Sequence, residues 1–405
     1  MNLRMKPCDI FVLAIMATST SLLPMAACAA APPAAHVATS QTVIRTPTEL
    51  RHYLKDTPAN ESPLSLLPAG ARKRFLGGLE WGSKGGVGGF GFADLQQYLT
   101  DTQIHKILAL FDLQNFDSKL HGRATPLTAA ERHAPETPLE HKFDKLYFAR
   151  EDSLRGGSRK PIAAIYDASL APYQNPKSIA ALDESDMRLL FRAVGIVASR
   201  TQSPRYLDDL RLDLATLHHR GLATPALVAS VHDQLVAARQ FSEANALAKQ
   251  YPAAHLSPLP PLRQAPNLHD GEPTVLVMEP NGKAMLHKPV DMHAPLLIVV
   301  VAGCHFSVDA VRAVRADPQL DALFHKHAVW LADENESLTD VLAWNRAYPN
   351  QPMNVAWRNS EWPALDSWLI PTYYVFRNGK LADQWSGWYS VHDLKTHLAK
   401  AGLLD

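Results

Sequence analysis

The sequence predicts a multi-domain α+β protein, in which a mainly α-helical N-terminal region is followed by a C-terminal α/β domain. Three observations support this expectation. The chain has 405 residues, too many for one ordinary domain, and 46% of them are hydrophobic, enough for packed cores. Apolar residues recur at helical spacing between residues 186 and 252. After residue 273, short β-rich runs alternate with amphipathic helical patterns, which is typical of α/β domains.

Residues 1–30 have the order of a secretory signal peptide. Basic residues come first, an apolar run over residues 10–17 follows, and small residues occupy 26–31. We therefore expect export to a bacterial periplasm and removal of the segment. The alternative is an outer-membrane lipoprotein, because Met-Ala-Ala-Cys, ending at Cys28, resembles a lipobox. Lipid on Cys28 would then be the chain's only contact with a membrane.

Residues 31–60 are rich in Ala, Pro, Thr and Ser, so we expect a flexible tether there. A mainly α-helical domain is expected over residues 61–251. Near its start, eight glycines fall between residues 77 and 91. We interpret this cluster as a flexible loop, because Gly89 and Phe90 stand where a phosphate-binding loop needs Lys and Ser or Thr.

Two kinds of signal mark helices in this domain. Thr100 and Gln103 form a capping box, which predicts a helix start. Apolar stripes predict two further helices: Leu189, Leu190, Ala193 and Val197 in one, and Leu207, Leu210, Leu214 and Leu217 in the other. Residues 225–252 resemble a tetratricopeptide unit, with two helices, a tight turn and a closing proline; an ordinary helical hairpin is the alternative. Such a region would offer a surface to a partner protein.

Six prolines between residues 252 and 273 indicate a stiff linker, and we place the main domain boundary there. The domain beyond it, 274–405, should contain elements in the order β, β, β, α, β, α, β, β, α. Six strands are expected: 274–278, one directly after the Asn281-Gly282 turn, 296–301, 328–331, 368–376 and 380–385. Three helices are expected: one directly after Cys304, one at 338–348 and one at 391–403.

This C-terminal third of the chain resembles the thioredoxin superfamily. A buried strand leads into Cys304-His305-Phe306-Ser307 at a helix start, and the Ile370-Pro371-Thr372 step looks like the family's cis-proline. The resemblance implies a thioredoxin-like fold with Cys304 as nucleophile and His305 and Ser307 beside it. It also implies that Ile370, Pro371 and Thr372 bind an extended peptide substrate as an added strand.

The placement of Cys304 would make its thiol reactive. A helix N-terminus presents N–H groups and partial positive charge, and both favour thiolate; protonated His305 would add charge, and Ser307 can donate a hydrogen bond. Cys304 would be the only thiol of the mature chain. Ser307, however, replaces the second cysteine of the family's Cys-x-x-Cys motif, and no Asp or Glu lies between Asp291 and Cys304 to accept a proton. Dithiol chemistry is therefore not expected.

Two functions remain open from the sequence. The first is monothiol thiol–disulfide exchange through Cys304 on periplasmic protein substrates, with release by glutathione or a partner's thiol. The second is a redox-inactive peptide-binding or assembly module, for example in an envelope or conjugation apparatus. The motif also looks like the Cys-Gly-Phe-Ser of cluster-binding monothiol glutaredoxins, but His305 would crowd the cluster. The two open functions differ in the reactivity of Cys304.

Other ligand classes are not expected. Lys and Arg number 40, as do Asp and Glu, so the chain lacks the positive excess that nucleic-acid binding needs. The 18 histidines form no complete metal-ligand set at recognised spacing, and no cofactor is predicted. Trp385 and Trp388, close together after the last predicted hairpin, are candidates for lining a peptide groove.

Overall fold

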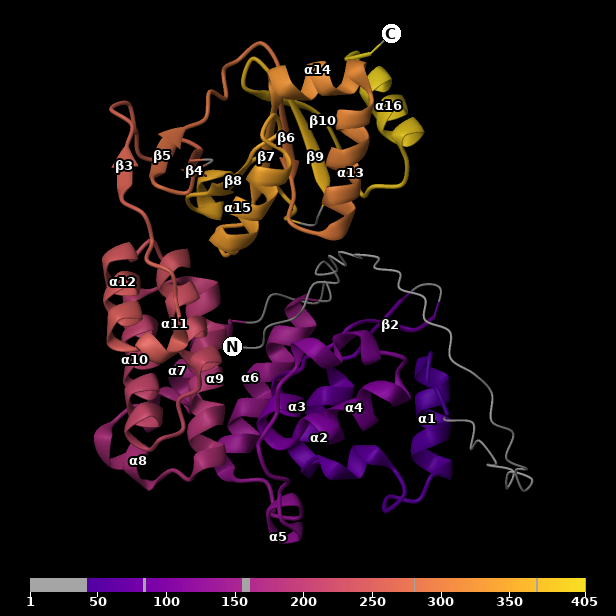
Figure 1. The fold of residues 1–405 in the computed structure, drawn as a ribbon, viewed down its shortest axis with the longest axis vertical. Coiled ribbons are helices and arrows are strands. Elements are labelled where there is room, and N and C mark those ends of the chain that lie inside the picture. The colour runs from indigo at the N-terminus through magenta and orange to yellow at the C-terminus, as the bar shows by residue number, and fades with distance from the viewer. Residues whose placement is uncertain (1–41, 83–84, 155–160, 280, 369–370, 405) are drawn as a thin grey trace, which may run out of the picture. The chain divides into compact units, whose positions relative to one another are not determined.

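The computed structural model describes residues 42–82, 85–154, 161–279, 281–368 and 371–404, and the predicted signal peptide and Cys28 lie outside these ranges. The described chain divides into two compact units, and the division falls between Pro135 and Glu136 (Figure 1). In the described residues, no helix is both long and apolar enough to cross a membrane.

The first unit is a small helical body with its own core. Its helices are α1 (Pro47–Asp56), α2 (Ala69–Gly77), α3 (Ala93–Tyr98), α4 (Asp101–Leu110) and α5 (Ala129–Arg132), with 3-10 turns at Pro63–Leu66 and Gln114–Lys119. The capping box predicted at Thr100 and Gln103 is confirmed at the start of α4. The core contains Phe75, Leu95 and Ile107, none of which is exposed.

Two predictions for this unit are corrected. The expected tether at residues 31–60 contains helix α1, because the Thr46 side chain accepts a hydrogen bond from the Glu49 N–H and Pro47 occupies the first turn. The glycine cluster is not simply a loop, since β1 (Glu80–Trp81) pairs antiparallel with β2 (Val87–Gly89).

The second unit begins with a layer of helices. These are α6 (Pro138–Leu154), α7 (Ile162–Ser169), α8 (Pro176–Ala181), α9 (Glu184–Thr201), α10 (Pro204–His219), α11 (Pro225–Ala237) and α12 (Phe241–Gln250), with 3-10 turns at Ala171–Tyr173 and Pro252–Ala254. All eight residues of the two predicted stripes are buried, on α9 and α10. The predicted hairpin at 225–252 is the α11–α12 pair, which buries Ala237 and Ala244.

An eight-stranded mixed sheet follows in the same unit, in the order β10-β9-β6-β7-β8-β4-β5-β3. Its strands are β3 (Leu262–Gln264), β4 (Thr274–Met278), β5 (Met285–Pro289), β6 (Leu297–Val301), β7 (Ala328–Ala332), β8 (Met353–Ala356), β9 (Thr372–Arg377) and β10 (Lys380–Ser386). Strands β6, β7 and β8 are mutually parallel, whereas β9 runs antiparallel to both β6 and β10.

The two faces of the sheet are covered differently. The helices α13 (His305–Ala316), α14 (Pro318–His327), α15 (Leu338–Ala347) and α16 (Val391–Lys400) bury apolar side chains in one core with Val300, Trp330 and Tyr373. The opposite face packs against Trp362 and Leu365, from the segment after β8. Residues on β4, β6 and β7 alternate between the two cores, as the pleat requires.

Three expectations for this region are corrected. Pro318 divides the single helix expected after Cys304 into α13 and α14, because its missing N–H and its ring cannot continue a helix, and Asp317 caps the second one. Strand β8 was not predicted. The expected linker at 252–273 contains β3, which pairs with β5, and the division of the chain falls at residue 135 rather than in this segment.

Two arginines explain why the helices at 136–254 belong with the sheet. Arg239, at the α11–α12 turn, donates to the carbonyls of Ala356 (2.6 Å) and Trp357 (3.1 Å). Arg358 donates in the reverse direction, to the carbonyls at residues 237 (3.0 Å) and 238 (2.9 Å). Charged donors to backbone carbonyls are among the stronger hydrogen bonds, so the two layers are joined by four of them.

Candidate functional site

Cys304 lies where the buried strand β6 ends and α13 begins. Gly303 has a φ of +151°, a conformation that favours glycine, and it turns the chain from the strand into the helix. Cys304 is the N-cap residue with extended backbone, and its side chain makes no capping hydrogen bond. The thiol is not in a disulfide, and the residue is only 7% exposed.

Ser307 lies directly beside this sulfur. Its Oγ is 3.7 Å from Cys304 Sγ and accepts a hydrogen bond from the Gly303 N–H at 3.3 Å. Ser307 is fully buried. Because the backbone N–H occupies one lone pair of the hydroxyl, its proton can point to the sulfur. The structure thus brings together two predicted site residues; the side chain of the third, His305, lies outside the described part.

Pro371 and Thr372 lie near the same end of the sheet, but their backbone is already engaged. The Pro371 carbonyl accepts from the Gly387 N–H at 2.8 Å. Thr372 pairs with Val301 on one side and with Ser386 on the other, so it offers no open strand edge. Ile370, the third residue of the predicted peptide-binding step, lies outside the described residues.

Tyr373 is a site residue that the sequence analysis did not single out. Its side chain is fully buried, and its hydroxyl has no hydrogen-bond partner. Burial raises the pKa of the Tyr373 hydroxyl, and the negative charge of the nearby Cys304 thiolate raises it further. Tyr373 pairs with Val300, close to the end of β6, which explains how a residue on β9 reaches the cysteine.

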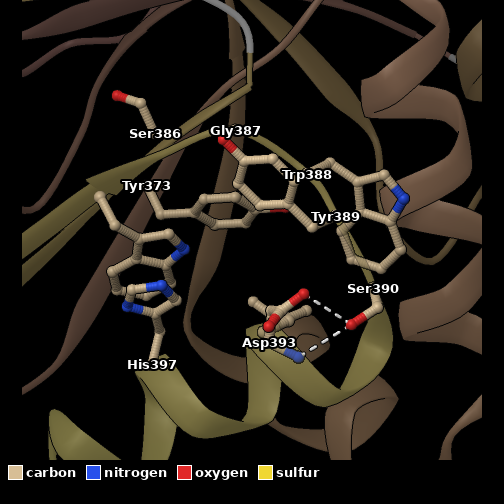
Figure 2. Close-up of a pocket in the computed structure, with 10 residues that line it drawn as sticks. Tyr373, Ser386, Gly387, Trp388, Tyr389, Ser390, Asp393 and His397 are labelled. Atoms are coloured by element: carbon tan, nitrogen blue, oxygen red, sulfur yellow. Dashed lines mark hydrogen bonds between the residues drawn. The ribbon is translucent and has the colours of Figure 1, made fainter.

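A solvent-open pocket is lined in part by Tyr373 (Figure 2). The rings of Tyr373, Trp385 and His397 form one stack, with 5.0 Å between successive ring centres. Trp388, Tyr389 and Asp393 contribute further to its walls. Both tryptophans named from the sequence thus line a pocket, whereas peptide binding there stays a prediction. The sequence analysis did not name Tyr389, which also lines the pocket and whose side chain is 81% exposed.

Metal ligands are not gathered in the described part of the chain: no group of three or more His, Cys, Asp or Glu side chains there could hold an ion. A neighbour of the Cys304 sulfur is instead the Ser307 hydroxyl, which can hydrogen-bond it. Among the residues that the structure describes, Cys304 is the one cysteine.

Comparison with known proteins leaves the site to be interpreted on its own geometry. No protein-family model matches the chain, and neither the curated proteins nor the solved structures contain a significant match. The arrangement itself provides one potential nucleophile at a helix start, one hydroxyl donor next to it, and a pocket lined by Tyr373, which pairs with the strand that leads to the nucleophile.

Proposed function

We propose that the protein carries out monothiol thiol–disulfide exchange through Cys304. The observation that carries the proposal is the position of this sulfur, at the N-terminus of α13 and 3.7 Å from the Ser307 hydroxyl. Amide N–H groups at a helix start and a neighbouring hydroxyl donor both stabilise a thiolate relative to a thiol.

The pairing of the strands around the site supports a thioredoxin-like arrangement. Strand β6 leads into α13, runs parallel to β7, and is antiparallel to β9, which continues through the Asn378-Gly379 turn into β10. Helix α16 then closes the chain. These elements follow one another in the order that the resemblance to the thioredoxin superfamily implies, with the thiol at the corresponding strand end, whereas β8, between α15 and β9, is additional to that order.

The reaction would proceed in two exchanges. Cys304 thiolate attacks one sulfur of a substrate disulfide; the substrate's S–S bond breaks, a mixed disulfide forms, and the other substrate sulfur leaves as a thiolate. A low-molecular-weight thiol such as glutathione, or a partner's thiol, then attacks the substrate sulfur of the mixed disulfide, and Cys304 leaves as a thiolate. Each exchange breaks one S–S bond and forms one, so the substrate disulfide is converted into one substrate thiol and one mixed disulfide between the substrate and the attacking thiol. Export to an oxidising periplasm, proposed from residues 1–30, would supply disulfide-containing proteins.

A second candidate is peptide binding without chemistry. Cys304 is only 7% exposed, so a disulfide could reach it only if neighbouring groups moved, whereas Tyr389 beside the pocket is 81% exposed. A redox-inactive module would hold a peptide at this pocket and contact an assembly partner through the α11–α12 pair.

The rate of Cys304 alkylation by iodoacetamide, followed by mass spectrometry across a pH series, tests the first candidate. We expect fast alkylation with a midpoint well below the value of about 8.5 for an ordinary thiol. The Ser307→Ala variant, which removes only the neighbouring hydroxyl, should raise that midpoint. Cys304→Ser should abolish the reaction and all exchange with disulfide peptides. A slow reaction with an ordinary midpoint would rule out exchange and favour the second candidate.

A further inference from the structure

The pocket beside Tyr373 contains a carboxylate that has no cationic partner. Asp393 Oδ2 accepts a hydrogen bond from the Ser390 hydroxyl at 2.7 Å, and the Asp393 N–H donates to the same hydroxyl at 3.1 Å. Within the described ranges Asp393 forms no ion pair, and its other carboxylate oxygen accepts no hydrogen bond. Lys395, the nearest cation along α16, pairs with Asp317 instead.

Aromatic rings line the same pocket as this carboxylate. Figure 2 shows the Tyr389 ring over the pocket, the Trp388 indole at one side, and Asp393 on the helix below them. Gly387 sets the position of Tyr389: its φ is +97°, and a Cβ built there would lie 3.1 Å from the Tyr389 ring. The chain thus uses a glycine to bring a large, 81% exposed ring against the turn.

Helix capping explains only part of this arrangement. Ser390 is the N-cap of α16 and Asp393 lies in its first turn, where a negative charge is favourable. Capping does not require the exposed Tyr389 or the neighbouring Trp388. A ring face and a carboxylate together attract one chemical class, an organic cation, through cation–π and ionic contact. The histidine of the pocket, His397, is stacked on Trp385.

We infer that this pocket binds the cationic side chain of a lysine or arginine in the polypeptide that the Cys304 site engages. The inference rests on the proposed function for the identity of that polypeptide, and it adds the substrate class. Tyr373 lines the pocket and pairs on β9 with Val300, near the end of the strand that leads to Cys304, so a peptide with its basic side chain here can extend towards the thiol. Acidic residues at the same position would be repelled by Asp393.

Equilibrium binding to the Cys304→Ser chain tests this without any thiol chemistry. The protein is labelled with 5-fluorotryptophan, and the Trp385 and Trp388 signals, assigned through Trp→Phe variants, are followed by fluorine NMR. The probes are three capped tripeptides, Ac-Gly-X-Gly-NH2, with X as lysine, norleucine or glutamate. We expect a saturable shift of the two pocket signals with the lysine peptide, at least fivefold weaker binding of the norleucine peptide, and none of the glutamate peptide.

Matched variants locate the effect. Asp393→Asn keeps an oxygen for Ser390 but removes the charge, and should weaken lysine-peptide binding about three- to fivefold. Tyr389→Ala should weaken it similarly. Asp383→Asn, on β10 and outside the pocket lining, should leave it unchanged. Equal binding of lysine and norleucine peptides, binding unaffected by Asp393→Asn, or no shift with any peptide would overturn the inference.

The outcomes separate the two proposals. Fast alkylation of Cys304 with no peptide binding would retain thiol exchange and reject the basic-residue pocket. An unreactive Cys304 with selective lysine-peptide binding would reject exchange and retain the pocket as the binding site of a redox-inactive module.

Discussion

Asp213, a buried carboxylate in the helical layer, provides a sharp test of how the second unit is stabilised. The residue lies on α10 and is fully buried. Its Oδ2 accepts a hydrogen bond from Gln174 Nε2 at 3.0 Å, while Asp213 Oδ1 and Gln174 Oε1 both lack partners. Burial, followed by the charge of Asp209, raises the pKa of Asp213 well above its ordinary value. Two acceptors therefore stay unsatisfied whenever Asp213 is ionised.

Replacing Asp213 with asparagine should correct this defect. The new amide keeps an oxygen for Gln174 Nε2 and gains a donor for Gln174 Oε1, so the two side chains can form a reciprocal amide pair. One added hydrogen bond contributes about 1 kcal/mol, and removal of an unsatisfied buried charge contributes at least as much. We expect Asp213→Asn to raise the free energy of unfolding by about 2 kcal/mol at about pH 8.

The gain should depend on pH in a defined direction. The folded-state pKa of Asp213 is raised above the unfolded value of 3.8, so the folded chain binds the proton more tightly. The wild type therefore loses stability as pH rises from 3.8 through the folded-state pKa, whereas the asparagine variant has no such titration. The advantage of the variant should be present at mildly alkaline pH and shrink towards zero as pH falls to 3.8.

Urea unfolding followed by far-ultraviolet circular dichroism, at several pH values, measures this difference. The control is Asp208→Asn on the same helix, because the Asp208 side chain is 70% exposed and only 3.4 Å from Arg211. An exposed pair of this kind contributes little, so the control should change stability by less than about 0.5 kcal/mol. A loss of stability in Asp213→Asn, or a gain that does not change with pH, would refute this account of Asp213.

Two further predictions concern the thiol and the joint between the layers. Ser307→Cys should convert the monothiol into a dithiol, because Cys304 Sγ and Ser307 Oγ are already 3.7 Å apart. Intact mass spectrometry should show a disulfide in this variant and none in Ser307→Ala, and the variant should accelerate the reduction of insulin by dithiothreitol. Arg358→Ala should lower the free energy of unfolding by about 2–3 kcal/mol, because its guanidinium donates to two carbonyls of the α11–α12 turn. Limited proteolysis should then cut faster at residues 255–261. An unchanged rate would contradict the conclusion that Arg358 holds the helical layer to the sheet.

Several elements of the fold were predictable because their signals are local. The β-branched run in β6 predicted a strand buried on both faces, and all five of its residues are buried. Asn378-Gly379 predicted the turn between β9 and β10. Cys304 was predicted at a helix start from the strand that precedes it and the apolar spacing that follows. Each of these inferences needs only a few neighbouring residues.

Other elements escaped prediction because distant residues create them. Strand β8 has only four residues and one β-branched side chain, yet it lies between β7 and β4 in the middle of the sheet. Its backbone groups find partners only after those strands are in place. The expected boundary near residue 260 was displaced for a similar reason, since Arg239 and Arg358 join the helices to the sheet across about a hundred residues of sequence.

The sequence by itself determined the helical character of α9 to α12, the position of Cys304 after a buried strand, and the replacement of a second cysteine by Ser307. These depend on periodicity and on which residue follows which. Tertiary structure alone decided which groups surround the thiol. Antiparallel pairing of β9 with β6 brings Tyr373 towards the cysteine, and the turn at Gly387 places Tyr389 over Asp393. Such neighbours depend on strand register and backbone angles, so a local pattern of residues cannot predict which groups lie beside the thiol.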